Sequence, residues 1–433
     1  MFKLDYPQLG EVVFSETLSN GLQVILIPKK DFFKTYGIMT TNFGSIDNHF
    51  VPIQSDESIL IPDGIAHFLE HKLFEGEEVD AFDEFSQLGA SANAFTSFTR
   101  TSYLFSTTSK VKENVETLLN FVQKPHFTIE GTEKEKGIIA QEINMYKDRP
   151  EWQLFYGLLK NMYPQHPISI DIAGTVDSIQ EITPELLQTC YDTFYHPANM
   201  NLLLIGNFEP DEMIEVIREN QNKKLFPKAE HILRLLPHED IAAFTEYSEI
   251  EMDVKRPKLA MGVKGLAPVT EGKELDLYYL KGSLLLDLLF GRGSENYIDL
   301  YDEGLVDDSF NYSFNIDRTF HFLSFESDTD HPEVLQQEWK RILLNWDTDA
   351  GMNKENFELL KRALIGEQLQ AFNSLEYVAN QYGSLRFNGI EMFDRIKHIE
   401  SLTLEDIKKF ADQYLKEQLI SAFVIRPKKK KKS

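Results

Sequence analysis

Two histidines and a glutamate fall within five residues of one another in the segment His67-Phe68-Leu69-Glu70-His71. Residues four apart lie on one face of a helix, with their Cβ atoms about 5–6 Å apart. Two imidazoles at that spacing can bind one zinc ion, because Zn–N bonds are about 2.0–2.1 Å long. Glu70 projects toward the same face and can reach a water molecule at the metal. We therefore expect His67 and His71 to be metal ligands and Glu70 to be the general base.

Paired histidines at helical spacing also occur as ordinary surface or core residues, so a third ligand is needed to favour a metal site. Glu142 is the candidate, because it lies among Ile138, Ile139 and Ile143. An unpaired carboxylate in such apolar surroundings would be costly to desolvate, and a cation would offset that cost. Glu135 precedes Glu142 by two helical turns and shares its face. We expect Glu142 to bind the metal and Glu135 to orient one of its ligands.

The elements around these residues are predicted from hydrophobic periodicity and turn residues. The histidines fall on a helix over Gly64–Phe74, for which Asp63 is the expected N-cap. Asn20-Gly21 is typical of a hairpin turn between two strands. Pro150 is expected to kink or divide a long helical stretch. The predicted strands are Glu11–Glu16, Leu22–Ile27, Tyr36–Asn42 and one or two within Ala92–Thr108, and the predicted helical stretches are Val111–Val122 and Thr132–Tyr163.

A repeat at an offset of about 220 residues indicates a duplicated domain. Ile182–Leu187 resembles Leu402–Ile407, and the apolar run Leu202–Ile205 resembles Ala422–Ile425. Each copy reads as a helix capped by a threonine, followed by a short buried strand. We therefore expect an α+β fold of two related domains of about equal size. The first, residues 1–225, carries the metal motif, and the second, residues 240–433, does not.

Composition limits the class of protein. Lys and Arg number 44 and Asp and Glu number 69 among 433 residues, which gives a formal net charge of −25. Such an acidic chain is a poor candidate for binding nucleic acid. The single cysteine, Cys190, excludes an intramolecular disulfide, and no apolar run is long enough for a membrane span. We expect a cytoplasmic protein, and the lysine run Lys428–Lys432 reads as a solvated end of the chain.

The chain resembles the pitrilysin/insulinase-type inverted zincin metallopeptidases, which include the processing peptidases. The resemblance implies a clamshell-forming subunit of two homologous α/β-roll domains, each a mostly antiparallel sheet flanked by helices. It also implies one Zn²⁺ per chain, held by His67, His71 and Glu142, with Glu70 as base and Glu135 as a supporting carboxylate. The segments that carry it are Leu18–Leu22, Phe43–Ser45, Gly64–His71, Asn93–Thr96 with Tyr103, and Tyr195–Met200.

The same resemblance implies where substrate would bind. The segment Asn93, Ala94, Phe95 and Thr96 corresponds to the family's edge strand, which would accept an extended peptide by adding it to the sheet. Such pairing reads the main chain more than the side chains. The implied activity is that of a metalloendopeptidase of unfolded or extended peptides, acting inside a dimeric chamber.

One departure from the family pattern concerns the second half of the chain. The family's second domain supplies an Arg and a Tyr that bind substrate, but here these positions hold Tyr301 and Asp307. An acid at an oxyanion contact would repel the developing negative charge. The resemblance therefore implies a heterodimer in which a homologous subunit supplies the Arg/Tyr pair. A catalytically silent assembly or scaffold subunit, or a self-sufficient homodimeric peptidase, are the alternatives.

Overall fold

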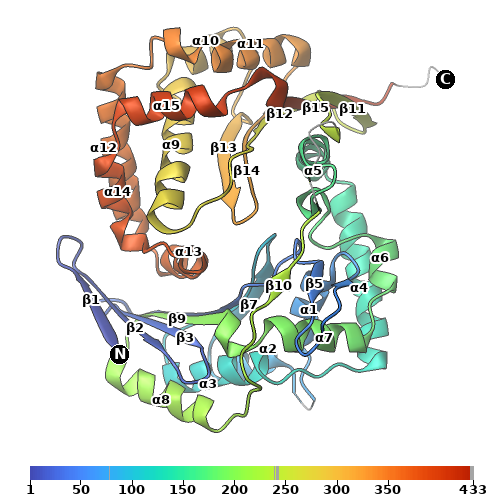
Figure 1. The fold of residues 1–433 in the computed structure, drawn as a ribbon, viewed down its shortest axis with the longest axis vertical. Helices are drawn as coiled ribbons and strands as arrows, with labels where there is room; N and C mark the ends of the chain where they lie inside the picture. The colour runs from blue at the N-terminus through green and yellow to red at the C-terminus, as the bar shows by residue number, and fades with distance from the viewer. Residues whose placement is uncertain (78, 238, 240–242, 430–433) are drawn as a thin grey trace. The chain divides into compact units, whose positions relative to one another are not determined.

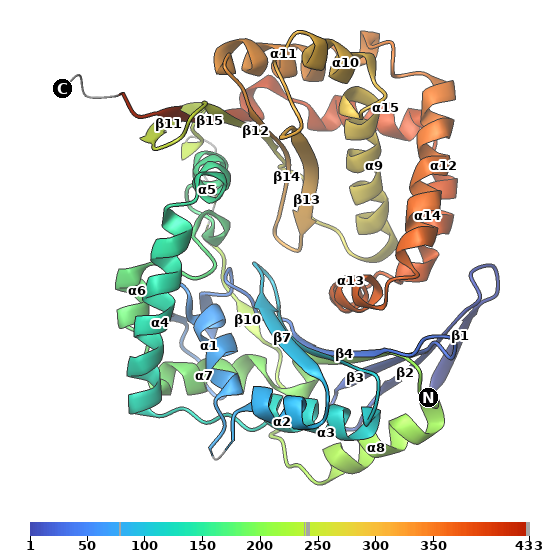
Figure 2. The same ribbon diagram turned by 180° about the vertical axis from the view of Figure 1, so that it is seen from behind.

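The structure is a computed structural model that describes residues 1–77, 79–237, 239 and 243–429 (Figures 1 and 2). The chain forms two compact units. Unit 1 contains Met1–Asn144, Ile170–Leu236 and Leu369–Phe387, and unit 2 contains Met145–Ser169, Pro237–Gln368 and Asn388–Ser433. Neither unit is one continuous piece of chain, so each takes one segment from the other half of the sequence.

Unit 1 is built on a seven-stranded sheet of order β1-β2-β3-β9-β4-β8-β7. Only β3 and β9 are parallel, and every other neighbouring pair is antiparallel. A small second sheet has the order β10-β5-β6. The strands are β1 Phe2–Tyr6, β2 Glu11–Thr17, β3 Gln23–Pro28, β4 Thr35–Thr41, β5 His49–Val51, β6 Ile59–Leu60, β7 Ser91–Thr96, β8 Thr101–Thr107, β9 Met200–Gly206 and β10 Leu233–Arg234.

Helices cover both faces of the large sheet, with α13 on one face and α3 and α8 on the other (Figures 1 and 2). Every residue of β4 and β9 is therefore buried, which explains the continuous apolar run Leu202–Ile205. The helices of unit 1 are α1 Ile65–Phe74, α2 Ala81–Gln87, α3 Val111–Val122, α4 Ile129–Lys147 without its last three residues, α6 Val176–Gln180, α7 Pro184–Phe194, α8 Pro210–Asn222 and α13 Leu375–Phe387.

Unit 2 contains a five-stranded sheet of order β11-β15-β12-β14-β13, in which only β11 and β15 are parallel. The strands are β11 Tyr247–Met252, β12 Lys258–Lys264, β13 Asn311–Asp317, β14 Phe320–Asp328 and β15 Ile420–Pro427. The helices are α5 Pro150–Met162, α9 Gly272–Phe290, α10 Glu295–Asp302, α11 Pro332–Leu344, α12 Lys354–Ala371, α14 Arg395–Ser401 and α15 Leu404–Tyr414. The last three residues of α12, after Gln368, belong to unit 1. This sheet repeats β3-β9-β4-β8-β7 of unit 1 in order and direction, which confirms the predicted duplication and the α+β class.

Most predicted elements are present, including the hairpin between β2 and β3, and the prediction of Asp63 as an N-cap is wrong. Pro150 ends one helical stretch and begins the next, α5. The N-cap of α1 is Gly64, and the side chain of Asp63 instead accepts a hydrogen bond from Asn48 at 3.1 Å. The hairpin after β2 closes over three residues, because the N–H of Leu18 bonds the carbonyl of Leu22 and only Gly21 has a positive φ of 91°.

The two halves of the sequence exchange equivalent helices. Helix α5, from the first half, packs on β12 and β15 of unit 2, and α13, from the second half, packs on β4 and β9 of unit 1. Asn201 of β9 donates a hydrogen bond to the carbonyl of Gly383 in α13 at 3.1 Å. Each unit therefore needs residues from both halves, and the assignment of 1–225 and 240–433 as separate domains stays a prediction.

No helix among the described residues is long and apolar enough to cross a membrane. Of the lysine run near the C-terminus, Lys428 and Lys429 follow the last strand, whereas Lys430, Lys431 and Lys432 lie outside the described residues.

We predict that Gly157→Ala destabilises unit 2, because a Cβ at Gly157 would overlap the ring of Phe423 on β15. Forcing a methyl group into a packed contact costs about 1–3 kcal/mol. Gly366 of α12 is the matched control, since a Cβ there meets no atom within 4 Å. Gly366→Ala should stabilise the protein by about 0.5–1 kcal/mol through helix propensity alone. Thermal unfolding of both variants tests this, and equal stabilisation by both would contradict the observed packing of α5.

Candidate metal centre

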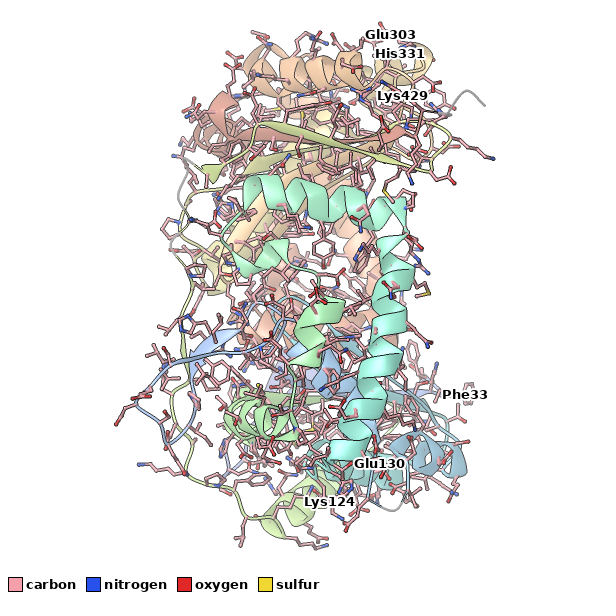
Figure 3. All side chains as sticks on the ribbon, turned by 90° about the vertical axis from the view of Figure 1, so that its right-hand side faces the viewer. Phe33, Lys124, Glu130, Glu303, His331 and Lys429 are labelled. Carbon is pink, nitrogen blue, oxygen red and sulfur yellow. The ribbon has the colours of Figure 1, made fainter. Side chains whose placement is uncertain are left out.

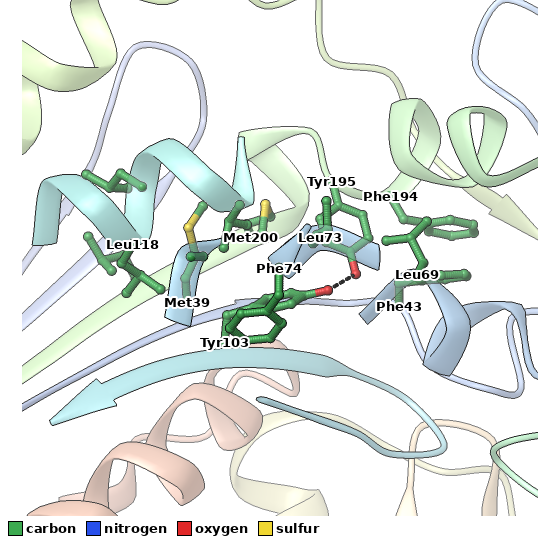
Figure 4. Packing of buried hydrophobic residues seen from close by; sticks show 14 of the residues in the cluster. Met39, Phe43, Leu69, Leu73, Phe74, Tyr103, Leu118, Phe194, Tyr195 and Met200 are labelled. Atoms are coloured by element: carbon green, nitrogen blue, oxygen red, sulfur yellow. Dashed lines mark hydrogen bonds between the residues drawn. The ribbon is translucent and has the colours of Figure 1, made fainter. Parts of the chain in front are cut away.

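Helix α1 is fixed at its start by a close backbone contact. Gly64 has a φ of 92°, and a Cβ there would overlap the carbonyl oxygen of Ala173, so glycine is required on both counts. Phe68, Leu69 and Leu73 then bury one face of α1 in the core, as Figure 4 shows for the two leucines. His67 and His71 lie on the remaining, partly exposed face, with 13% and 27% of their side chains accessible. The core packing of α1 therefore determines where both imidazoles point.

Helix α4 carries the two carboxylates and is anchored independently. Figure 3 shows α4 from the side, with Glu130 labelled near its beginning. Ile139 and Ile143 are buried in the core of unit 1, and Lys136 donates a hydrogen bond at 3.0 Å to the carbonyl of Gln180 at the end of α6. The expected apolar surroundings of Glu142 are incomplete in one place, because Ile138 is 46% exposed.

The structure brings His67, His71 and Glu142 together. One possible ligand atom from each lies within 4.8 Å of the others, and the described residues contain one such group. The Nε2 atoms of His67 and His71 lie 3.8 and 3.7 Å from the two carboxylate oxygens of Glu142. Tetrahedral bonds of zinc length would place neighbouring ligand atoms about 3.4 Å apart. The three side chains therefore fit a zinc ion with only small adjustments.

The protonation state of His67 and the orientation of His71 suit a metal at this position. Burial, together with the neighbouring His71, lowers the pKa of His67 to about 3, so its imidazole is neutral and able to bind a metal. The Nδ1 atom of His71 lies 2.9 Å from Glu135, which directs its Nε2 toward Glu142. Burial alone would lower the pKa of His71, but the hydrogen bond that its ring donates to Glu135 and the charges of Glu70, Glu135 and Glu142 raise this pKa above its ordinary value. Glu135 thus lies where the sequence predicts an orienting carboxylate.

Glu70 lies on the same helix but is more deeply buried, with 8% of its surface exposed. Burial raises its pKa to about 6, and a hydrogen bond from Thr96 partly opposes that shift. The Thr96 hydroxyl donates to Oε2 of Glu70 at 2.6 Å. A carboxylate with these properties can hold and release a proton near neutral pH.

A pair of tyrosines in the core extends the polar surroundings of Glu70. The hydroxyls of Tyr103 and Tyr195 lie 2.8 Å apart, as the dashed line in Figure 4 shows. Burial raises the pKa of each tyrosine well above its ordinary range, and the charge of Glu70 adds to the shift. Both hydroxyls therefore stay protonated.

The predicted substrate segment forms β7, the end strand of the seven-stranded sheet. Its members do not all face one way. Ala92 and Ala94 pack against the core beside α1, whereas Asn93 is exposed and its side chain accepts a hydrogen bond from the N–H of Ala94 at 2.9 Å. The ring of Phe95 lies beneath the guanidinium of Arg100. Thr96 faces Glu70, a contact that sequence spacing alone does not indicate because the two residues belong to different elements.

The two positions that depart from the family pattern lie in unit 2. Tyr301 is on α10 and is 48% exposed. Asp307 accepts hydrogen bonds from Arg256 at 2.7 Å and from the N–H of Ser309 at 2.9 Å. These bonds hold the pKa of Asp307 below its usual value despite the opposing effect of burial. Asp307 is therefore a charged carboxylate that forms a partly exposed ion pair with Arg256.

Two models of one known protein family match successive parts of this chain. Residues 62–176 match the family model described as insulinase, peptidase family M16. Residues 181–364 match the model described as the peptidase M16 inactive domain. The first match covers all of α1 and α4, including all three candidate ligands.

One relative and one solved structure cover nearly the whole chain. The zinc protease YmfH of Bacillus subtilis strain 168 is 46% identical over 427 residues, which are 98% of this chain and 99% of that protein. AlbF of the same strain, also named as a zinc protease, is 31% identical over 49% of this chain and 50% of its own length. The crystal structure of an M16-like peptidase from Alicyclobacillus acidocaldarius superposes with a TM-score of 0.93 and 38% identity, covering 98% of this chain and 99% of that one.

We predict that Glu135→Gln weakens zinc binding, because the amide replaces the charged partner of the His71 imidazole. Loss of such an orienting carboxylate costs about 10- to 100-fold in metal affinity. Glu130, exposed near the start of the same helix, is the matched control, and Glu130→Gln should bind zinc as the wild type does. Competition with a chromophoric chelator measures both affinities. An unchanged affinity in Glu135→Gln would show that Glu135 does not support the ligand.

Proposed function

Because this chain belongs to peptidase family M16, a family of zinc proteases, we propose that it is a metalloendopeptidase subunit with one zinc ion held by His67, His71 and Glu142. The observation that carries the proposal is the convergence of these three ligand atoms within 4.8 Å on the exposed side of two anchored helices. A chain that had lost catalysis would have no need to keep two neutral or oriented imidazoles facing one carboxylate.

Zinc at this position supplies a Lewis acid that polarises a carbonyl group and makes a water molecule more acidic. The protein's own contribution is made by Glu70. Its carboxylate takes the proton from the attacking water and returns it to the nitrogen of the leaving amine, and a pKa raised by burial favours both transfers. Glu135 keeps the imidazole of His71 oriented through its 2.9 Å contact. Tyr103 and Tyr195 remain neutral in the core behind these groups.

The substrate class we propose is an unfolded or extended peptide. β7 is the last strand of its sheet and pairs with β8 on one side. It also lies beside α1, so a peptide added along β7 would run past Glu70 and the candidate ligands. Main-chain pairing of this kind tolerates many side chains, which favours a broad specificity, and Asn93, Ala94, Phe95 and Thr96 are the proposed contact segment.

We further propose that a homologous subunit completes the active site within a dimeric chamber. Tyr301 and Asp307 occupy the positions at which the family pattern has Arg and Tyr, and Arg256 already neutralises Asp307. Asp307 has no donor for an oxyanion and Tyr301 lacks the positive charge of an arginine, which supports an outside source for the Arg/Tyr pair. A silent scaffold subunit and a homodimeric peptidase remain the alternatives, and a cytoplasmic location remains part of the proposal.

We predict that Glu70→Gln keeps its zinc and loses peptide cleavage. The amide has nearly the same shape but cannot accept the proton, and general base catalysis contributes about 10²- to 10⁴-fold. Zinc content by atomic absorption and cleavage of dye-labelled casein give the two readouts. Glu84→Gln, on the exposed side of α2, is the control and should retain both zinc and activity. Cleavage at the wild-type rate by Glu70→Gln would remove Glu70 from the mechanism.

We predict that the purified chain cleaves casein slowly and is activated by a homologous subunit that carries the Arg/Tyr pair and lacks the zinc ligands. The reason is that Asp307 would repel an oxyanion and Tyr301 lacks the positive charge of the Arg at its position in the family pattern. Titrating the partner while monitoring cleavage and complex size measures the effect, and a partner with its Arg changed to Ala serves as control. Full activity of the chain alone would favour the homodimeric alternative, and zinc binding without cleavage at any ratio would favour the scaffold.

A further inference from the structure

We propose that Thr96 is a positioning residue, whose hydroxyl holds the Glu70 carboxylate in the orientation needed for proton transfer. This inference rests on the proposed function and adds a residue to it. It also changes the role of Thr96, which the family resemblance places among the substrate contacts. The role proposed for the Thr96 hydroxyl is to bind the base, and only the main chain of Thr96 remains available to the peptide.

The contact between the two side chains is short and specific. Oγ1 of Thr96 donates to Oε2 of Glu70 at 2.6 Å, a separation typical of a hydroxyl bonded to a charged carboxylate. No other side-chain hydrogen bond to Glu70 is found among the described residues. With one oxygen held by Thr96, the other remains for the water and for the leaving amine. The bond therefore distinguishes two otherwise equivalent carboxylate oxygens.

The hydroxyl of Thr96 has only one proton, and its surroundings leave that proton to Glu70. The nearest other hydroxyl is that of Thr101, at 3.4 Å. Thr101 commits its own proton to the carbonyl of Phe43 at 2.9 Å, so it does not compete as a donor to Glu70. A carboxylate is the stronger acceptor of the two oxygens facing Thr96. Thr96 therefore cannot also donate to a substrate without releasing Glu70.

The backbone also fixes the position of Thr96. Thr96 is the last residue of β7 and pairs with Thr101 across a tight hairpin. The tip of that hairpin is tied to the loop after β4, because the N–H groups of Ser45 and Ile46 donate to the carbonyls of Ser97 and Phe98 at 3.1 and 3.0 Å. β-branched side chains have few χ1 rotamers. A stiff side chain on a pinned strand is suited to fixing another group.

Glycine at position 44 makes that attachment possible. A Cβ there would overlap the backbone of Phe98 and Thr99 at the hairpin tip. The N–H of Gly44 also donates to Asp47 at 2.9 Å, which turns the loop toward the hairpin. The Phe43-Gly44-Ser45 segment thus supports the base through the hairpin that carries Thr96.

The experiment compares Thr96→Val, Thr96→Ser and Thr108→Val, using zinc-loaded protein with its partner subunit and an internally quenched peptide selected from a library. Valine removes the hydroxyl and keeps the shape, and serine keeps the hydroxyl. We expect Thr96→Val to lower kcat about 10- to 100-fold, the effect of losing a hydrogen bond to a charged group, with KM and zinc content unchanged. Serine should restore most of the rate. Thr108, exposed just after β8, is the matched control and should have no effect.

The outcomes separate this inference from the proposed function. A raised KM with unchanged kcat would assign Thr96 to the substrate and overturn the positioning role, as would wild-type kinetics in Thr96→Val. If the wild type itself cleaves no peptide, the proposed function fails, and crystal structures of the zinc-loaded wild type and Thr96→Val decide the remaining point. A Glu70 carboxylate that keeps its orientation without the hydroxyl would refute the inference, and one that rotates away would support it.

Discussion

Holding two imidazoles and a carboxylate within 4.8 Å of one another is the constraint on which the rest of unit 1 depends. Without a cation, polar groups so close together and partly removed from water are unfavourable. Their positions are set from outside the cluster, by Gly64 and the apolar face of α1 on one side and by Ile139, Ile143 and Lys136 of α4 on the other. The packing of two helices thus maintains an arrangement that the side chains would not adopt alone.

Residues close together in the sequence made the central part of this site predictable. His67, Glu70 and His71 lie on one turn of helix, where spacing alone fixes their common direction. Glu142 was harder to predict, because its apolar neighbours indicated burial but not which face of α4 meets α1. Ile138 shows the limit of that reasoning, since it is 46% exposed although it lies in the same apolar run. The duplicated fold was predictable because the repeat preserves both the capping threonines and the buried strands.

Contacts between different helices and strands could not be predicted from the sequence. Asp63 has the residue type of an N-cap, but a close approach to Ala173 favours Gly64 with its positive φ, and the Asp63 side chain bonds Asn48 instead. The exchange of α5 and α13 is equally hidden, because periodicity shows an apolar face and not which sheet covers it. The bond from Thr96 to Glu70 joins a strand and a helix whose register is known only once both are packed. In each case the missing information is the partner, not the local conformation.

The second half of the chain shows what the same architecture does without imidazoles. In the order of the repeat, α9 corresponds to α1 and α12 corresponds to α4. Asp287 lies as far from the end of α9 as His71 lies from the end of α1. Glu367 lies as far from the start of α12 as Glu142 lies from the start of α4. The Asp287 carboxylate accepts a hydrogen bond from Tyr312 at 2.9 Å, and burial and the charge of Glu367 still raise its pKa. Tyr312 thus provides in unit 2 the stabilisation that a cation would provide in unit 1. The two halves therefore surround their corresponding acids with different groups, and the first places its carboxylate beside the histidine pair proposed to bind the metal.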